Sequence, residues 1–134
     1  MNSAEHHAVV LGASPKPARY SNQAIRLLRE HGYRVTPIHP KFAEIEGMEV
    51  KASLATVDEP IDTLTLYVGA ERLEPMIEEL LSAAPARVVF NPGTESTLVQ
   101  QRLDQAGIPW IEACTLVMLR TGTFHGWEVA QHPT

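Results

Sequence analysis

Small residues, cations and hydroxyl groups follow one another directly after the first apolar run of the chain. The run Ala8-Val9-Val10-Leu11 ends at Gly12, Ala13 and Ser14. Small residues at the end of a buried strand let backbone N–H groups approach a ligand, and the positive end of a following helix favours its negative charge. The loop continues with side chains that can bind phosphate, namely Lys16, Arg19, Tyr20 and Ser21. This pattern predicts a site for a phosphate-bearing nucleotide.

The loop does not carry the glycine fingerprint of dinucleotide-binding proteins. That fingerprint is G-x-G-x-x-G, and after Gly12 the next glycine is Gly32. An NAD site also needs an acidic residue at the end of the second strand, whereas this sequence has His39 and Lys41 in that region. A cation there suits an additional phosphate, such as the 3′-phosphate of coenzyme A or the 2′-phosphate of NADP.

Length and composition favour one domain over residues 1–134, with a core at about residues 6–120. The chain has a formal net charge of −5 and one cysteine, Cys114. The acidic balance argues against nucleic-acid binding, and no apolar run approaches the roughly 20 residues of a membrane span. The lone cysteine and the lack of a signal-peptide pattern favour the cytoplasm. Residues 1–51 nevertheless carry seven basic and five acidic residues, a net of +2, so the first loops form a local positive field.

Apolar runs alternate with amphipathic segments along the chain. Helices are expected from Ser21, which could cap the first one, to His31; from about Glu71 to Ala84, with Pro75 in the first turn; from Thr94 to Ala106; and from Cys114 to Arg120. Strands are expected at 8–11, 34–38, 63–68, 87–90 and 109–111. Strands that alternate with helices predict an α/β fold with a parallel sheet and right-handed crossovers. We therefore expect a three-layer, Rossmann-like, doubly wound fold with a five-stranded parallel sheet in the order 3-2-1-4-5.

That strand order would bring four loops together at the carboxyl edge of the sheet, where open α/β sheets bind ligands. It makes the first and fourth strands neighbours, so that Gly12, Ala13 and Ser14 lie beside the loop of the fourth strand. The residues of that loop are Asn91, Pro92 and Gly93. His39 and Val68 stand at the ends of the other two strands and complete the predicted crevice.

Several short motifs in this order resemble the family of small stand-alone CoA-binding domain proteins. They are Val9-Val10-Leu11-Gly12-Ala13-Ser14, Pro17, Arg19, Ser21, His31-Gly32-Tyr33-Arg34-Val35, Pro40-Lys41, Gly47, Ser53-Leu54 and Ile61-Asp62. The resemblance covers about residues 6–120, and the family's fold is similar to the N-terminal domain of the succinyl-CoA synthetase α subunit. The family commonly has Asn-Pro where this chain has His39-Pro40.

The resemblance implies a protein that binds coenzyme A, or an acyl-CoA, by its nucleotide end and without catalysis. It implies that Gly12, Ala13 and Ser14 contact the phosphates, with Arg19 and Ser21 beside them. It further implies that Pro40 and Lys41 border the adenosine and its 3′-phosphate, and that Val68 lines the adenine. No nucleic-acid or membrane partner is expected, and a homodimer stays open.

An enzymatic alternative rests on Cys114. This cysteine precedes a predicted helix, where its pKa could be lowered and its thiolate could act as a nucleophile. The alternative is a small NADP-linked or acyl-transferring enzyme that uses the same crevice, although a buried structural cysteine explains the residue as well. The six histidines show no ligand pair with a carboxylate, so no metal site is predicted.

Overall fold

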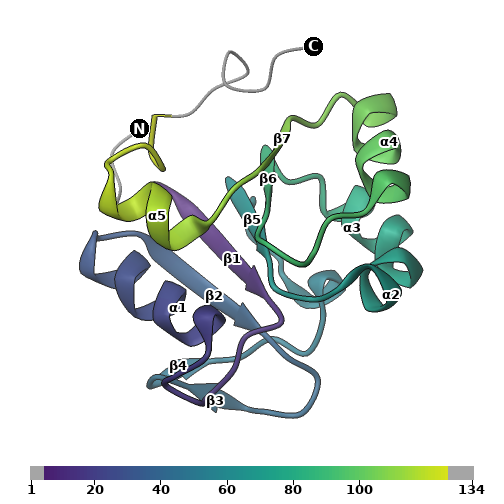
Figure 1. Ribbon diagram of the computed structural model, residues 1–134. Coiled ribbons are helices and arrows are strands. Elements are labelled where there is room, and N and C mark those ends of the chain that lie inside the picture. Colours follow the sequence, from purple (N-terminus) through teal and green to yellow (C-terminus); the bar gives the residue numbers. More distant parts are fainter. Residues whose placement is uncertain (1–4, 127–134) are drawn as a thin grey trace.

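Five parallel strands form the centre of the protein, and the computed structural model describes residues 5–126 (Figure 1). Every residue of the strands β1, β5 and β6 is buried, which agrees with their content of Val, Leu and Phe, and the polar residues among them, His7, Thr63, Thr65 and Arg87, are buried as well. The strands are β1 (His7–Leu11), β2 (Arg34–Ile38), β5 (Thr63–Leu66), β6 (Arg87–Phe90) and β7 (Trp110–Glu112).

Helices cover both faces of this sheet. They are α1 (Tyr20–Glu30), α2 (Ala70–Leu73), α3 (Ile77–Ala83), α4 (Thr97–Ala106) and α5 (Thr115–Arg120), with 3₁₀ turns η2 (Leu54–Thr56) and η3 (Glu74–Met76). Helices α1 and α5 lie on one face, and α2, α3 and α4 lie on the other (Figure 1). Within residues 5–126, no helix is both long and apolar enough to cross a bilayer.

Alternate residues of each strand enter two separate cores. Val9, Leu11, Leu64, Leu66 and Val88 pack with the buried side chains of α2, α3 and α4. Ala8, Val10 and Val89 pack with those of α1 and α5. The predicted three-layer α/β fold with a five-stranded parallel sheet is therefore confirmed.

The order of the strands within this sheet differs from the prediction. The observed order is β2-β1-β5-β6-β7, which is 2-1-3-4-5 when the five strands are counted along the chain. Strand β1 pairs with β2 and β5, so its second neighbour is the third strand rather than the fourth. The chain therefore switches sides between β1 and β5.

Pro37 gives the physical reason for this order. Proline has no N–H to donate to a neighbouring strand, so it is tolerated at the edge of a sheet and not at its centre. The outer side of β2 is instead closed by Lys51, whose N–H donates to the Pro37 carbonyl (3.0 Å) and whose carbonyl accepts from the His39 N–H (3.1 Å). The predicted order would have placed β2 inside the sheet.

Helix α1 begins and ends with backbone geometry rather than with a side-chain cap. Arg19 is its N-cap residue and no side chain caps the helix, so the predicted capping role of Ser21 is wrong; Ser21 lies one residue inside the helix. At the other end Gly32 has φ +86°, the left-handed conformation that a glycine adopts at low cost. The predicted glycine stop of this helix is confirmed.

The helix expected from Glu71 to Ala84 is divided into three parts. It begins at Ala70, so Pro75 falls in the second turn, where its ring conflicts with the carbonyl four residues earlier. The segment responds by tightening into η3 before α3 begins. Leu73, Ile77 and Leu80 are still buried, so the predicted apolar stripe packs on the sheet as expected.

A two-stranded antiparallel hairpin follows β2. It consists of β3 (Glu44–Ile45) and β4 (Met48–Glu49), joined at Glu46 (φ +51°) and Gly47 (φ +75°). Two consecutive positive φ values are typical of the tight turn that suits hairpin twist. The hairpin lies near the start of α1 (Figure 1).

Buried polar side chains connect β5 and β6 at the amino edge of the sheet. Arg87 Nε donates to Thr63 Oγ1 (2.5 Å), and His6 Nε2 lies 2.7 Å from the same oxygen. Since arginine can only donate, the Thr63 hydroxyl is free to donate its own proton to His6, which is then neutral. This cluster lies at the opposite edge from the predicted crevice.

Candidate functional site

The loops after β1 and β5 pack directly against each other at the carboxyl edge of the sheet. Gly12 has φ +91°, and a Cβ at this position would lie 2.8 Å from Val68 Cγ1 and 2.9 Å from the Tyr67 carbonyl oxygen. Only glycine fits here without displacing its neighbours. Because the chain changes sides between β1 and β5, this is the switch point at which open α/β sheets bind ligands.

The loop after β6 lies next to this pair. A Cβ on Gly69 would lie 3.9 Å from the carbonyl oxygen of Gly93. Pro92 and Gly93 are exposed, and the N–H of Gly93 donates to Glu95 Oε1 (3.0 Å). The loops after β1, β5 and β6 are thus neighbours, but the predicted direct contact between the β1 loop and the β6 loop is wrong, because β5 lies between β1 and β6.

The backbone amides of Gly12 and Ala13 are engaged within the fold. Both donate to the carbonyl oxygen of Ile38, at 3.2 and 3.1 Å. They fix the end of β1 to the end of β2. A phosphate at this edge therefore has to be bound by other groups than these two amides.

The first turn of α1 offers such groups. The first helical hydrogen bond of α1 runs from the Gln23 N–H to the Arg19 carbonyl, so the N–H groups of Tyr20, Ser21 and Asn22 precede it. None of these three amides has a hydrogen-bond acceptor among residues 5–126. Unpaired amides and the helix dipole together favour an anion at this point.

Asn22 fixes the loop that leads into α1. Its side chain is fully buried, and Nδ2 donates to the Ser14 carbonyl (2.9 Å) and to Glu46 Oε2 (3.0 Å), while Oδ1 accepts from Arg26 Nε (2.8 Å). The loop of β1, helix α1 and the hairpin are thereby joined through one amide. Asn22 was not among the residues predicted for the site, although a polar side chain on the buried face of the predicted helix was a signal for it.

Four exposed cations surround this part of the sheet. Lys16 and Arg19 lie in the β1 loop, Lys41 follows β2, and Arg72 lies in α2. Among residues 5–126 none of these four side chains forms a salt bridge or a hydrogen bond. Within this range Arg120 on α5 also forms neither, and every other lysine and arginine of the chain forms at least one of them. Arg72 was not among the predicted site residues, although it lies within the helix that was predicted to begin at about Glu71.

His39 lies between two of these cations, half-buried at the end of β2. Burial and the positive charges of Lys41 and Arg72 lower the pKa of His39. Its Nδ1 accepts from the Lys41 N–H (2.9 Å), which requires a ring nitrogen without a proton. His39 is therefore neutral and fixes the turn that presents Pro40 and Lys41, both of which are exposed.

The side chain of Asn91 is buried within the fold and is not exposed in the loop. Its Nδ2 donates to Thr65 Oγ1 (2.7 Å) and to the Leu66 carbonyl (2.9 Å). Its Oδ1 accepts from the Thr115 N–H (2.8 Å) at the start of α5. Both amide hydrogens are used, so Asn91 holds β5, β6 and α5 together below the loops.

Cys114 is the N-cap residue of α5 and is partly buried. The nearby Tyr67 hydroxyl is buried and has no hydrogen-bond partner within the described part of the chain. Burial is the main cause that raises the pKa of Tyr67. Because this environment disfavours a negative charge on Tyr67, the phenol stays protonated.

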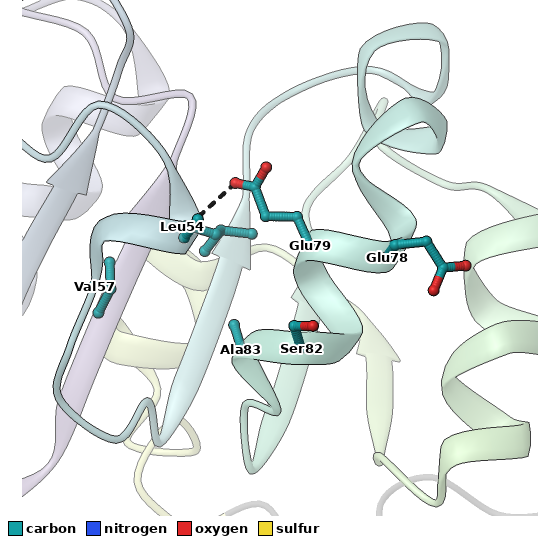
Figure 2. Close-up of a pocket in the computed structure, with 7 residues that line it drawn as sticks. Leu54, Val57, Glu78, Glu79, Ser82 and Ala83 are labelled. Carbon is teal, nitrogen blue, oxygen red and sulfur yellow. Dashed lines mark hydrogen bonds between the residues drawn. The ribbon is translucent and has the colours of Figure 1, made fainter.

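A groove elsewhere on the surface contains none of the predicted site residues. It has a volume of about 520 Å³ and lies between η2 and α3 (Figure 2). Its lining includes Leu54, Val57, Ser82 and Ala83, and Glu79 Oε2 crosses it to accept from the Ala55 N–H (3.2 Å). No group of three potential metal ligands occurs within residues 5–126.

Comparison with known proteins identifies relatives of this chain. A solved structure from Thermus thermophilus, described as cell-free ID.343, is 34% identical and superimposes with a TM-score of 0.82 over 89% of this chain and 90% of that one. The uncharacterized protein YneT of Bacillus subtilis is 32% identical over 72 residues, 54% of this chain and 53% of that protein. Acetate–CoA ligase [ADP-forming] I of Archaeoglobus fulgidus is 30% identical over 70 residues, 52% of this chain and 10% of the ligase.

These two curated relatives are thus matched over about half and about a tenth of their own lengths. The sequence profile of one family, described as CoA binding domain, matches residues 6–120. That range includes all five strands of the sheet and the loops at its carboxyl edge. The chain therefore belongs to the CoA-binding domain family.

Proposed function

We propose that this protein binds coenzyme A or an acyl-CoA by its nucleotide end, at the crevice formed by the loops after β1, β2, β5 and β6, and that it does so without catalysis. The observation that carries the proposal is the position of the unpaired cations. Lys16 and Arg19 precede the open amides of the first turn of α1, Lys41 follows β2, and Arg72 lies in the helix that follows β5. On a chain with a net charge of −5, cations gathered at one edge favour a small polyanion.

The chemistry of coenzyme A fits this arrangement. Its nucleotide carries a diphosphate and a separate 3′-phosphate. The amides of α1 and the side chains of Lys16 and Arg19 suit the diphosphate, because helix N-termini and cations both favour its charge. Lys41 and Arg72 extend the positive field to the next loops, where a second phosphate group could bind. Membership of the CoA-binding domain family supports the same ligand.

The residues near the crevice support binding rather than chemistry. Cys114 is the candidate nucleophile, and it occupies the N-cap position of a short helix, partly buried and near a tyrosine that stays protonated. Glu95, the acidic residue of the β6 loop, accepts from the N–H of Gly93. Glu95 thus has a structural role that needs no reaction to explain it.

A calorimetric titration tests the proposal. Coenzyme A, acetyl-CoA, dephospho-CoA, NADP and ADP are compared, and we expect coenzyme A to bind more tightly than dephospho-CoA, with weaker binding at high salt. Equal affinity for coenzyme A and dephospho-CoA would remove Lys41 from the site. Tighter binding of NADP than of coenzyme A would favour a small NADP-linked enzyme instead.

A pair of matched variants tests the role of the cations. Arg19→Ala should weaken binding by about 1–3 kcal/mol, the usual cost of a lost charge-assisted hydrogen bond. Arg120→Ala removes an equally exposed and unpaired arginine from α5, so it changes the net charge without touching the crevice. Equal losses in both variants would mean that only the overall charge matters, and the crevice would not be the binding site.

A further inference from the structure

Phe42 is an aromatic residue that the fold leaves in solvent. Among residues 5–126 the exposed large hydrophobic side chains are Tyr20, Phe42, Leu98 and Val117, and Phe42 is 41% exposed. It belongs to neither core and follows Lys41 directly. A partly exposed phenyl ring beside a cation offers a flat apolar surface to a ligand.

His39 supports this ring from one side. The centroids of the two rings are 4.5 Å apart, and the ring planes are inclined at 49°. His39 is itself fixed, because its N–H donates to the Lys51 carbonyl and its Nδ1 accepts from the Lys41 N–H. The turn from His39 to Phe42 therefore holds the phenyl ring in place while leaving much of its surface open.

The charges around Phe42 limit what can cover it. Lys41 is its neighbour in the chain, and the charge of Arg72 reaches His39. Neither cation has an acidic partner within the described residues. A ligand for this position should therefore combine a flat apolar surface with negative charge close to it. A nucleobase joined to a phosphorylated ribose has both properties, and bases stack on aromatic side chains with little regard to sequence.

We propose that Phe42, supported by His39, stacks on the base of the bound nucleotide and that this stacking, rather than hydrogen bonds to the edge of the base, determines recognition of the base. The inference rests on the proposed function, because it assigns a part of the same crevice. It extends the site to a residue that the motifs in the sequence do not single out. A ring provides affinity for a flat base but does not distinguish one base edge from another.

Three substitutions separate stacking from simple burial. Phe42→Leu keeps an apolar side chain of similar size but removes the ring, Phe42→Ala removes both, and Phe42→Trp keeps a ring. Leu98→Ala is the control, because Leu98 is also exposed but lies on α4. We expect Phe42→Ala and Phe42→Leu each to weaken coenzyme A binding about tenfold or more, and Phe42→Trp and Leu98→Ala to change it less than twofold.

Two further ligands identify the contact. Inorganic diphosphate, measured as a competitor, has no base and should bind equally well to wild type and Phe42→Leu. Coenzyme A with a 1,N6-etheno-adenine has a blocked base edge and should bind wild type within about threefold of coenzyme A, with its fluorescence quenched by the ring. That quenching should disappear in Phe42→Leu.

The outcomes distinguish the two proposals. If wild type fails to bind coenzyme A, the proposed function fails and this inference fails with it. If wild type binds coenzyme A but Phe42→Leu binds it equally well, only the stacking role of Phe42 is wrong. The stacking role is also wrong if Phe42→Leu weakens the binding of coenzyme A and of diphosphate alike, since Phe42 would then only shape the loop. It is wrong as well if the etheno ligand does not bind to wild type.

Discussion

Replacement of Gly12 by alanine should destabilise the fold more than the same replacement at Gly47, Gly93, Gly107 or Gly122, where a Cβ would meet no heavy atom within 4 Å. The new Cβ would lie 2.8 Å from Val68 Cγ1 and 2.9 Å from the Tyr67 carbonyl oxygen, and a backbone oxygen cannot move aside as a side chain does. The positive φ adds about 1–2 kcal/mol and the overlap about 1–3 kcal/mol, so we expect a loss of about 2–5 kcal/mol in the free energy of unfolding.

Gly107→Ala provides the matched control. Gly107 has φ +73°, and a Cβ there would meet no heavy atom within 4 Å, so only the conformational part of the cost, about 1–2 kcal/mol, should appear. Urea unfolding measures both variants. Val68→Ala in the Gly12→Ala background should recover a part of the loss, because it removes one of the two contacts but leaves the carbonyl in place. Equal losses in Gly12→Ala and Gly107→Ala would refute the close packing of the β1 and β5 loops.

Three other predictions follow from buried or partly buried side chains. Asn91→Ala leaves the Thr115 N–H and the Leu66 carbonyl without their partner and should lower the free energy of unfolding by about 2–4 kcal/mol, as measured in urea; a loss below about 1 kcal/mol would contradict its role. Burial, followed by the charge of Arg87, lowers the pKa of His6 to about 4, below its usual 6.5. The unfolded chain therefore takes up this proton first as the pH falls, so about 2–3 kcal/mol of stability should be lost between pH 6.5 and pH 4, and His6→Gln should reduce this dependence in urea titrations at pH 7 and pH 4.5. An unchanged dependence in the variant would show that other groups cause it. Cys114→Ser should leave the affinity for coenzyme A almost unchanged, and a thiol reagent should label wild type slowly at neutral pH, whereas fast labelling that coenzyme A prevents would indicate a reactive cysteine.

The elements of the fold could be predicted from the sequence because their signals are local. The buried strands appear as apolar runs, Gly32 and Gly107 mark helix ends, and the apolar stripe from Leu73 to Leu80 identifies a helix packed on the sheet. The strand order is a tertiary property, and it was predicted wrongly. Pro37 contained the needed information, since a proline in a strand indicates an edge.

Of the candidate site, the sequence could predict those residues whose role follows from their charge and from their position at the end of a strand. Lys16, Arg19 and Lys41 stand at strand ends and are exposed there. Arg72 and Asn22 were missed because their roles depend on which distant segment lies beside them, the end of β2 for Arg72 and the hairpin for Asn22, and neither neighbour is local in the sequence. Asn91 was selected for its position, and only the structure shows that its hydrogen-bonding groups are used within the fold.

The buried amide of Asn22 has a consequence for the kinetics of ligand capture. Because it ties Ser14 and Glu46 to the first turn of α1, the conformational freedom of the β1 loop is lost when the chain folds. A ligand that arrives at these amides meets a preorganised loop and does not have to order it again. Association should therefore be limited by diffusion and electrostatic attraction, and differences between ligands should appear in their rates of dissociation.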